Sequence, residues 1–183
     1  MKALTTLIAF LRGINVSGQK PVRMTDLVAL FESLGYARVR TYIQSGNVVF
    51  EAAAGGVDAL ESDIGEAIRK KYGYEVTVII RTADELRDIV AGNPLLKILG
   101  IAPDRFYVTL FDRIPDARKV AGLAMGEDDA ERYEVKGREA YLYCPRGYGR
   151  SRLNNQAFEK KLGLAATTRS WKTMLALLEM TQP

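Results

Sequence analysis

The sequence of 183 residues contains no histidine. This absence excludes Ser-His-Asp and Cys-His catalysis, HExxH metalloprotease chemistry and the usual zinc sites, because each of these needs an imidazole. Cysteine is nearly absent as well, and with Cys144 as its one representative an intramolecular disulfide is excluded. Other catalytic groups remain, so the sequence alone does not decide whether the protein is an enzyme.

Long apolar segments are also missing. No run approaches the ~20 apolar residues that a membrane-spanning helix needs. The run from Leu7 to Leu11 is short, meets Arg12 and is not followed by a small-residue cleavage site, so we interpret it as a buried strand and not as a secretion signal. With one cysteine and no signal, we expect a cytoplasmic protein without a membrane partner.

Recognisable carboxylate pairs and activated thiols are missing too. Asp128 and Asp129 are adjacent, so their side chains diverge, and they lie in a polar loop. Cys144 precedes Pro145 at the end of a predicted strand, and without a histidine beside it we expect an inert, partly buried thiol. We therefore predict neither a metal site nor a cofactor.

The charge that is present is distributed unevenly. The net charge of +4 comes entirely from residues 94–183, because residues 1–93 contain 11 basic and 11 acidic side chains. From Arg132 to Lys172 there are 10 basic residues against 3 acidic ones. Such a stretch is suited to an anionic partner, although a solvated basic surface explains it equally well.

Hydrophobic periodicity and turn residues predict the same order of elements twice. Each half of the chain gives a strand, a helix, a strand hairpin, a helix, a strand and a helix. A βαββαβ order is most simply satisfied by a four-stranded antiparallel sheet with helices on one face. We therefore predict an α+β protein of two successive βαββαβα ferredoxin-like units with mainly antiparallel sheets, residues 1–93 and 94–183, packed as one compact body. The repetition suggests a duplication.

The expected boundaries follow the apolar runs, Gly and Pro. The predicted strands are 4–11, 39–43, 48–50, 76–80, 106–111, 133–135, 140–143 and 165–168, and the predicted helices are 27–34, 57–72, 82–90, 117–125, 153–162 and 171–180.

The first candidate site is the loop from Gly13 to Lys20, GINVSGQK. Its backbone N–H groups and its lysine could bind a phosphate or carboxylate before a helix. The loop nearly matches a P-loop, but Gln19 separates its glycine from its lysine, and Pro21 replaces the hydroxyl that binds Mg²⁺. A purely structural turn is the alternative. The predicted topology gathers at this edge of the sheet the candidate ligand-binding residues Arg12, Asn15, Lys20, Gln44, Ser45 and Asn47.

The second candidate site is the loop RGYGRSR, from Arg146 to Arg152, before a helix that Ser151 or Asn154 could cap. Several guanidinium groups near helix N-termini suit an anionic ligand through charge-assisted, bidentate hydrogen bonds. The alternative is that these arginines are simply exposed, or paired with Glu159 or Glu179. The candidate residues here are Arg146, Arg150, Ser151, Arg152, Thr168 and Arg169.

An RNA-recognition module shares the βαββαβ order and exposes aromatic residues on its two central strands. Its consensus places aromatics where this chain has Arg138 and Ala140. Tyr107, Tyr141 and Tyr143 could still form an open stacking surface. The alternative, which we favour, is that they pack the sheets of the two units against one another.

Three segments, LRGINVSGQKPVRM, RTYIQSGNVVF and TTRSWKT, closely resemble the domain of unknown function 1697 family, and the resemblance extends over essentially the whole chain. It implies a small bacterial cytoplasmic protein with paired ferredoxin-like units, and it brings no established activity. The chain departs from the family pattern at Ser17, usually glycine, and at Ser170, commonly asparagine. The family's recurrent polar positions correspond here to Arg12, Asn15, Gln44, Ser45, Gly46, Asn47, Thr168, Arg169, Trp171 and Thr173.

From these observations we expect a protein that binds an anionic ligand, a nucleotide or a nucleic acid, with basic, glycine-containing loops. One alternative is a histidine-free enzyme acting on a small phosphorylated or carboxylated metabolite in a concave pocket at the Gly13 to Lys20 edge. Another is an assembly module without a ligand. The sequence gives neither the ligand nor the oligomeric state.

Overall fold

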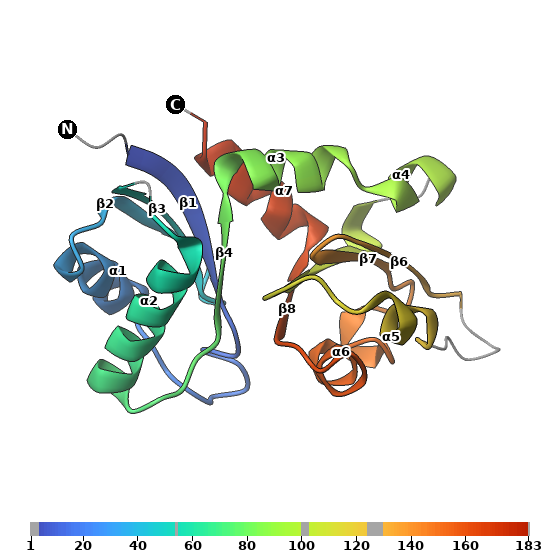
Figure 1. Ribbon diagram of the computed structural model, residues 1–183, viewed down its shortest axis with the longest axis horizontal. Coiled ribbons are helices and arrows are strands. Elements are labelled where there is room, and N and C mark those ends of the chain that lie inside the picture. Colours follow the sequence, from blue (N-terminus) through green and yellow to red (C-terminus); the bar gives the residue numbers. More distant parts are fainter. Residues whose placement is uncertain (1–3, 54, 100–102, 124–129, 183) are drawn as a thin grey trace. The chain divides into compact units, whose positions relative to one another are not determined.

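The computed structural model describes residues 4–53, 55–99, 103–123 and 130–182. They form two repeated βαββαβα units, each around a four-stranded antiparallel sheet (Figure 1). The strand order is β2-β3-β1-β4 in the first sheet and β6-β7-β5-β8 in the second, so equivalent strands occupy equivalent places. This order confirms the predicted α+β fold of two ferredoxin-like units.

The first unit contains β1 (Leu4–Leu11), α1 (Met24–Ser33), β2 (Ala37–Tyr42), β3 (Asn47–Ala53), α2 (Val57–Tyr72), β4 (Val78–Thr82) and α3 (Ala83–Ala91). The helix α4 (Pro94–Leu99) and the 3₁₀ turn η1 (Pro103–Arg105) follow. The repeat then gives β5 (Phe106–Phe111), α5 (Ala117–Ala121), β6 (Arg132–Lys136), β7 (Glu139–Tyr143), η2 (Tyr148–Arg150), α6 (Asn155–Leu162), β8 (Ala166–Ser170) and α7 (Trp171–Met180). Helix α5 ends at Ala121, and Gly122 and Leu123 are not helical, so the predicted helical end at Met125 is wrong; residues 124 and 125 lie outside the described residues.

The core of the first unit lies between its sheet and the helices α1 and α2, which Figure 1 shows on the same side of the sheet. Successive side chains of a strand point to opposite faces. In β1, the alternate residues Leu7, Ala9 and Leu11 join the cluster that contains Phe31 of α1 and Ile64 of α2. The hydrophobic core between the sheet and the two helices therefore follows from the spacing of apolar residues in β1, α1 and α2.

The opposite face of the first sheet is buried as well, and it contains an arginine. Ile8 and Phe10 of β1 have no exposed surface, and Ile8 is paired with Arg81 of β4. Arg81 is also fully buried, and its Nη1 donates to the Ile80 carbonyl at 3.0 Å. Burial of a guanidinium is tolerable only with hydrogen-bond partners of this kind.

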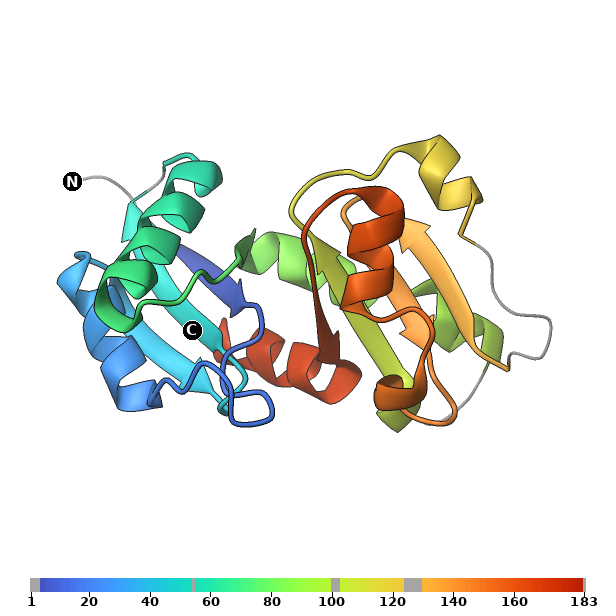
Figure 2. The same ribbon diagram turned by 90° about the horizontal axis from the view of Figure 1, so that it is seen from below.

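In the second unit, α6 lies over one face of the sheet (Figure 2). Phe158 of α6 packs there with Phe111 of β5, Leu142 of β7 and Ala166 of β8. The rings of Phe111 and Phe158 meet edge to face, with centroids 5.4 Å apart. The helix therefore covers the same face of its sheet that α1 and α2 cover in the first unit.

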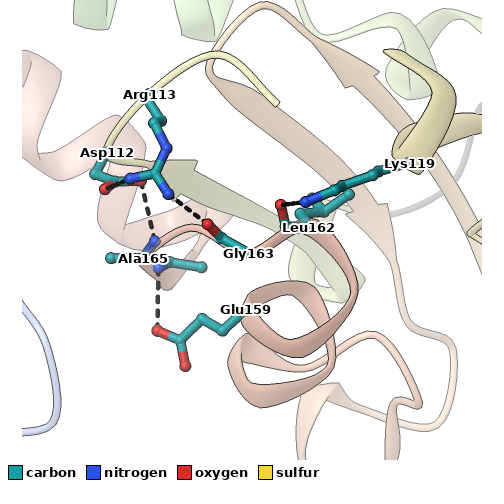
Figure 3. A network of polar contacts seen from close by, with 8 residues as sticks. Asp112, Arg113, Lys119, Glu159, Leu162, Gly163 and Ala165 are labelled. Carbon is teal, nitrogen blue, oxygen red and sulfur yellow. Dashed lines mark hydrogen bonds and ion pairs between the residues drawn. The ribbon is translucent and has the colours of Figure 1, made fainter. Parts of the chain in front are cut away.

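The carboxyl end of α6 is held by two cations (Figure 3). Lys119 Nζ donates to the Leu162 carbonyl at 3.2 Å, and the Arg113 guanidinium donates to the Gly163 carbonyl. The last carbonyls of a helix lack partners within it and carry partial negative charge, so cations stabilise them. Part of the basic excess of this half therefore serves the fold.

The chain divides into two compact units, Met1–Arg87 with Ala176–Pro183, and Asp88–Leu175. The division runs through α3 and α7, so both connections between the units are helical. The predicted boundary at residue 93 was placed from the order of the elements along the chain. In the structure, residues 176–183, which include the end of α7, belong to the first compact unit. There, Arg40 Nη2 donates to the Met180 carbonyl at 2.5 Å.

Candidate functional site

The loop between β1 and α1 forms a small hairpin. The Gln19 N–H donates to the Val16 carbonyl at 2.9 Å, and Ser17 and Gly18 between them have φ of 50° and 74°. Two consecutive left-handed residues are typical of a type I′ turn. Ser17 therefore adopts, at a cost of roughly 1 kcal/mol, a conformation that glycine would adopt freely.

Asn15 closes this hairpin and connects it to the turn between β2 and β3. Its Nδ2 donates to the Val22 and Gln44 carbonyls, both at 2.8 Å, and its Oδ1 accepts from the Val22 N–H at 2.8 Å. Both amide hydrogens of Asn15 are used by these bonds. The predicted proximity of the loop and Gln44 is confirmed, and Asn15 braces that contact.

Other predicted residues of this cluster also bond to the chain itself. Asn47 is fully buried, and its Nδ2 donates to the Tyr42 carbonyl and to Ser45 Oγ, both at 3.0 Å. Lys20 Nζ donates to the Glu75 carbonyl at 2.6 Å. Asn47 and Ser45 thus stabilise the turn between β2 and β3, a common role for Asn and Ser, and Lys20 ties the loop to the segment before β4.

Arg12 directly follows β1, and its backbone N–H donates to the Thr77 carbonyl at 2.9 Å. This bond ties the start of the loop to the segment before β4. Arg12 therefore lies beside the hairpin, as predicted from the topology.

A cleft of about 400 Å³ lies beside this cluster. The side-chain amide of Gln44 is exposed at the cleft and forms no hydrogen bond with the described residues. Helix α1 begins there without a side-chain hydrogen bond from its capping residue Arg23. Burial, together with the carboxylate of Asp26, raises the pKa of Tyr72. The residues that line the cleft are Asn15, Pro21, Val22, Arg23, Met24, Thr25, Asp26, Gln44 and Tyr72.

The loop from Arg146 to Arg152 is fixed at its centre by Tyr148. The Tyr148 hydroxyl lies 2.9 Å from Thr168 Oγ1 and accepts from the Asn155 N–H at 2.9 Å. Thr168 Oγ1 in turn lies 2.7 Å from Asn155 Oδ1 and 2.7 Å from Thr109 Oγ1. This network joins the loop, the start of α6 and the strands β5 and β8, and it confirms the predicted contact between the loop and Thr168.

The three arginines of this loop, Arg146, Arg150 and Arg152, are exposed. The guanidinium of Arg150 forms no hydrogen bond or ion pair with the part of the chain that the structure describes. No acidic residue occurs from Ala140 to Phe158. Gly147 has φ of 86° and ψ of 150°, a conformation that is essentially limited to glycine.

Ser151, which was predicted to bind the ligand or to cap α6, is buried. Its Oγ donates to Glu131 Oε2 and accepts from the Leu153 N–H, both at 3.1 Å. The cap of α6 is Asn154, whose Oδ1 accepts from the Ala157 N–H at 3.0 Å. Ser151 therefore shapes the backbone between the arginines and the helix.

Arg169 is only 7% exposed. Its Nη1 donates to Thr167 Oγ1 at 2.7 Å and to the Thr168 carbonyl at 2.9 Å. Burial lowers the pKa of Arg169 to about 10, so the guanidinium keeps its charge at neutral pH. The structure thus places this predicted residue inside the second unit, while Arg146, Arg150 and Arg152 lie on its surface.

Tyr107, Tyr141 and Tyr143 do not form one open stacking surface. Tyr141 is paired with Val108, the neighbour of Tyr107, so Tyr107 and Tyr141 point to opposite faces of the sheet. Tyr141 is buried and donates to a backbone carbonyl of α3, while Tyr107 packs against Tyr148 with ring centroids 5.3 Å apart. The RNA-recognition hypothesis therefore loses its stacking platform.

Among the described residues, no cluster of three or more histidine, cysteine, aspartate or glutamate side chains could hold a metal ion. None of the helices in that part of the chain is long and apolar enough to cross a membrane. Asp128 and Asp129 lie outside the described residues. Burial raises the pKa of the Cys144 thiol to about 11, which keeps it protonated at neutral pH.

A second cleft, of about 710 Å³, lies beside β2 and was not predicted from the sequence. Its charged lining residues are Glu32, Arg38, Arg40 and Glu51. The only signal in the sequence was the alternation Arg-Val-Arg at the start of a predicted strand. Alternating charge on an edge strand is common, so it did not indicate a cleft.

A solved structure with the same fold is the conserved bacterial protein SP0830 from Streptococcus pneumoniae, which is 18% identical in sequence. The match covers 98% of this chain and 100% of that chain with a TM-score of 0.72, and it shows the fold alone. No curated protein matches the sequence. The model of the family described as "Protein of unknown function (DUF1697)" matches residues 4–141, and the chain therefore belongs to the DUF1697 family.

Proposed function

We propose that this protein binds an anionic ligand, a nucleotide or a nucleic acid, through residues 146–152, which we call the arginine loop. The observation that carries the proposal is the exposure of Arg146, Arg150 and Arg152 on one fixed loop. Guanidinium groups bind phosphate oxygens by charge-assisted, bidentate hydrogen bonds. Phosphate is therefore the group that this loop is best suited to recognise.

The rigidity of the arginine loop supports the proposal. Tyr148 fixes the loop to Thr168 and to the start of α6, and Gly147 adopts a conformation that few other residues could adopt. A backbone that is ordered before binding loses less conformational entropy when the ligand arrives. The arginines are thus presented from a fixed backbone, which favours binding.

The local electrostatics point in the same direction. The segment from Ala140 to Phe158 adds no carboxylate that would compete with a phosphate for the guanidinium groups. Lys119 and Arg113 bind carbonyls at the far end of α6 (Figure 3), so they are engaged in the fold. Three exposed arginines, Arg146, Arg150 and Arg152, precede the amino end of α6.

The exposed arginines and the orientation of the tyrosines in the second unit indicate how it would recognise a nucleic acid. Tyr107 and Tyr141 lie on opposite faces and do not together form a platform for bases, so we expect contacts to phosphate to dominate. Binding of nucleic acid should then depend little on sequence and strongly on salt. Three arginine-phosphate contacts correspond to a slope of about −2 in a plot of log affinity against log salt for a single strand.

The test is fluorescence anisotropy with labelled single-stranded RNA and DNA and with a labelled nucleotide at two salt concentrations. We expect Arg150→Ala with Arg152→Ala to weaken binding by at least about tenfold and to reduce the salt slope by roughly 1.4. The matched control is Lys160→Ala with Lys161→Ala, which removes the same charge from exposed positions on α6. Equal losses in both variants, or no binding at ~50 mM salt, would refute the proposal.

The cleft beside Gln44 supports a second candidate function, recognition of a small carboxylated or phosphorylated metabolite in the first unit. The Gln44 amide and the Thr25 hydroxyl line this cleft and form no hydrogen bonds with the described residues. Calorimetry with acetate and with inorganic phosphate tests it. Binding that Gln44→Ala weakens and Arg150→Ala leaves unchanged would support this cleft, and no millimolar binding of either anion would eliminate it.

A further inference from the structure

The cleft beside β2 lies entirely within the first unit, and we call it the β2 cleft. Its volume of about 710 Å³ is in the range of sites that bind small molecules. Its walls come from β1, from the edge strand β2, from β3, from the end of α1 and from the residues after α7. The lining residues are Thr6, Glu32, Arg38, Val39, Arg40, Val49, Phe50, Glu51, Thr181 and Gln182.

The charges that line the β2 cleft balance. Arg38 and Arg40 supply two positive charges, and Glu32 and Glu51 supply two negative ones. A phosphate or another dianion would meet as many carboxylates as guanidinium groups, and like charges at contact distance are unfavourable. A ligand that carries one group of each sign would meet complementary charge at both ends.

The charged side chains are available for exchange with a ligand. Arg38 Nη1 lies 3.3 Å from Glu51 Oε1, but the Arg38 side chain is 77% exposed, so this ion pair contributes at most about 1 kcal/mol. Arg40 uses one guanidinium N–H on the Met180 carbonyl. The Glu32 carboxylate forms no ion pair or hydrogen bond with the described residues.

A bulge in β2 places these groups. The register shifts between Ala37 and Arg40, so that Arg38 and Val39 together lie opposite the one residue Phe50 of β3. Arg38 has φ of +48°, which costs an arginine roughly 1 kcal/mol. Bulges redirect side chains next to binding sites, and they also protect edge strands. The charge of Arg38 also discourages edge pairing, and the bulge at this residue determines where its guanidinium lies at the cleft.

We propose that the β2 cleft binds a zwitterion of the free amino acid class. Arg40 and Arg38 bind the α-carboxylate, because a guanidinium can donate two parallel hydrogen bonds to it. Glu32 and Glu51 bind the α-ammonium group. The side chain of the ligand packs against the apolar lining that includes Val49.

The test is a titration of the full-length ¹⁵N-labelled protein with a panel of free L-amino acids, followed by NMR. We expect at least one of them to shift the amide signals of Arg38, Val39 and Gln182 in a saturable manner. Two analogues of the best binder, one lacking the amino group and one lacking the carboxylate, should bind at least about tenfold more weakly. If no amino acid shifts these signals at millimolar concentration, or if either analogue binds as tightly, the proposal is wrong.

Variants separate a loss of the site from a loss of the fold. Arg40→Met and Glu32→Gln should each weaken binding by about tenfold, whereas Arg87→Met, an exposed arginine on α3, should leave it unchanged. Arg38→Gly removes a charge together with the backbone strain. It should weaken binding without lowering the melting temperature, and unchanged affinity in this variant or an equal loss in Arg87→Met would overturn the proposal.

Discussion

Arg81 and Arg169 occupy equivalent positions in the two units. Arg81 of β4 is paired with Ile8 of β1, and Arg169 of β8 is paired with Val108 of β5. Each donates through Nη1 to the carbonyl of the residue before it, and a helix begins two residues after each of them. The two units therefore resemble each other even in the position and bonding of one buried arginine side chain. The comparison with Arg81 also favours a structural role for Arg169, which we leave out of the proposed ligand surface.

The hydroxyl of Tyr148 should contribute measurably to stability. Tyr148→Phe removes the acceptor of the Asn155 N–H and one of the partners of Thr168 Oγ1, which keeps its contacts with Asn155 Oδ1 and Thr109 Oγ1. We expect the free energy of unfolding in urea to fall by about 1–3 kcal/mol. The control is Tyr107→Phe, because the Tyr107 hydroxyl forms no hydrogen bond with the described residues. Equal losses in the two variants would contradict this assignment.

The buried thiol of Cys144 should make stability depend on alkaline pH. Burial raises the pKa of Cys144 from 9.0 to about 11; the hydrogen bond with Ser151 opposes this shift and the charge of Glu131 adds to it. Because the folded pKa lies above the unfolded one, the stabilising contribution is complete below pH 9 and is lost as the pH rises towards 11.

The measurement is the difference in the free energy of unfolding between the wild type and Cys144→Ala, which cancels the titration of the tyrosines. Between about pH 9 and about pH 11, the free energy of unfolding of the wild type should fall relative to that of Cys144→Ala. A difference that stays constant over this range would show that the thiol is not perturbed.

At the scale of elements, the turn between β2 and β3 shows why one glycine is required. A Cβ on Gly46 would lie 2.8 Å from Leu11 Cβ and 2.9 Å from Ile14 Cδ1, and φ at Gly46 is 77°. Gly13 has a similar φ of 74°, but nothing lies within 4 Å of the position of its Cβ. A substitution at Gly13 would therefore meet backbone strain alone, whereas a substitution at Gly46 would meet backbone strain and steric overlap.

We therefore expect Gly46→Ala to destabilise the protein more than Gly13→Ala. Gly13→Ala should cost about 1 kcal/mol for the left-handed backbone, and Gly46→Ala roughly 2–4 kcal/mol because overlap with two buried side chains is added. Urea denaturation of both variants measures this contrast. A loss in Gly13→Ala as large as that in Gly46→Ala would show that overlap is not the reason.

The elements with the clearest periodicity were predicted well. The strand Leu4–Leu11 and the helix Trp171–Met180 have the predicted bounds, because a continuous apolar run and an uninterrupted helical pattern define them. The bulge at Arg38 was not predicted. Nothing in the local sequence indicates a positive φ at an arginine, since the conformation depends on the register of the neighbouring strand.

The sequence predicted which loops and residues of the candidate sites lie close together, but it did not predict what each side chain bonds to. Strand order determines which loops share an edge, so the contacts of Asn15 with the Gln44 carbonyl and of Tyr148 with Thr168 followed the predicted topology. The sequence could not tell that Asn15 and Ser151 bond to their own unit. Asn and Ser satisfy backbone and buried groups as readily as they bind ligands, and the choice depends on atomic distances.

At the scale of the whole molecule, the first unit is completed by the other end of the chain. The segment Ala176–Pro183 belongs to it, while Asp88–Leu175 form the second unit. Both crossings between the units occur within a helix, in α3 and in α7. Helix formation is cooperative, so a helix that crosses a boundary couples the residues on its two sides. We therefore expect the two units to unfold together.

Leu177 and Leu175 of α7 allow this coupling to be measured. Leu177 is fully buried and Leu175 is 42% exposed, so Leu177→Ala should cost about 2–5 kcal/mol and Leu175→Ala at most about 0.5 kcal/mol. Leu177 belongs to the first unit, whereas Trp171, the single tryptophan, is buried in the second. Leu177→Ala should shift the urea midpoint by tryptophan fluorescence as far as by circular dichroism. A fluorescence midpoint that stays at the wild-type value, while circular dichroism shows an earlier partial loss, would mean that the units unfold independently.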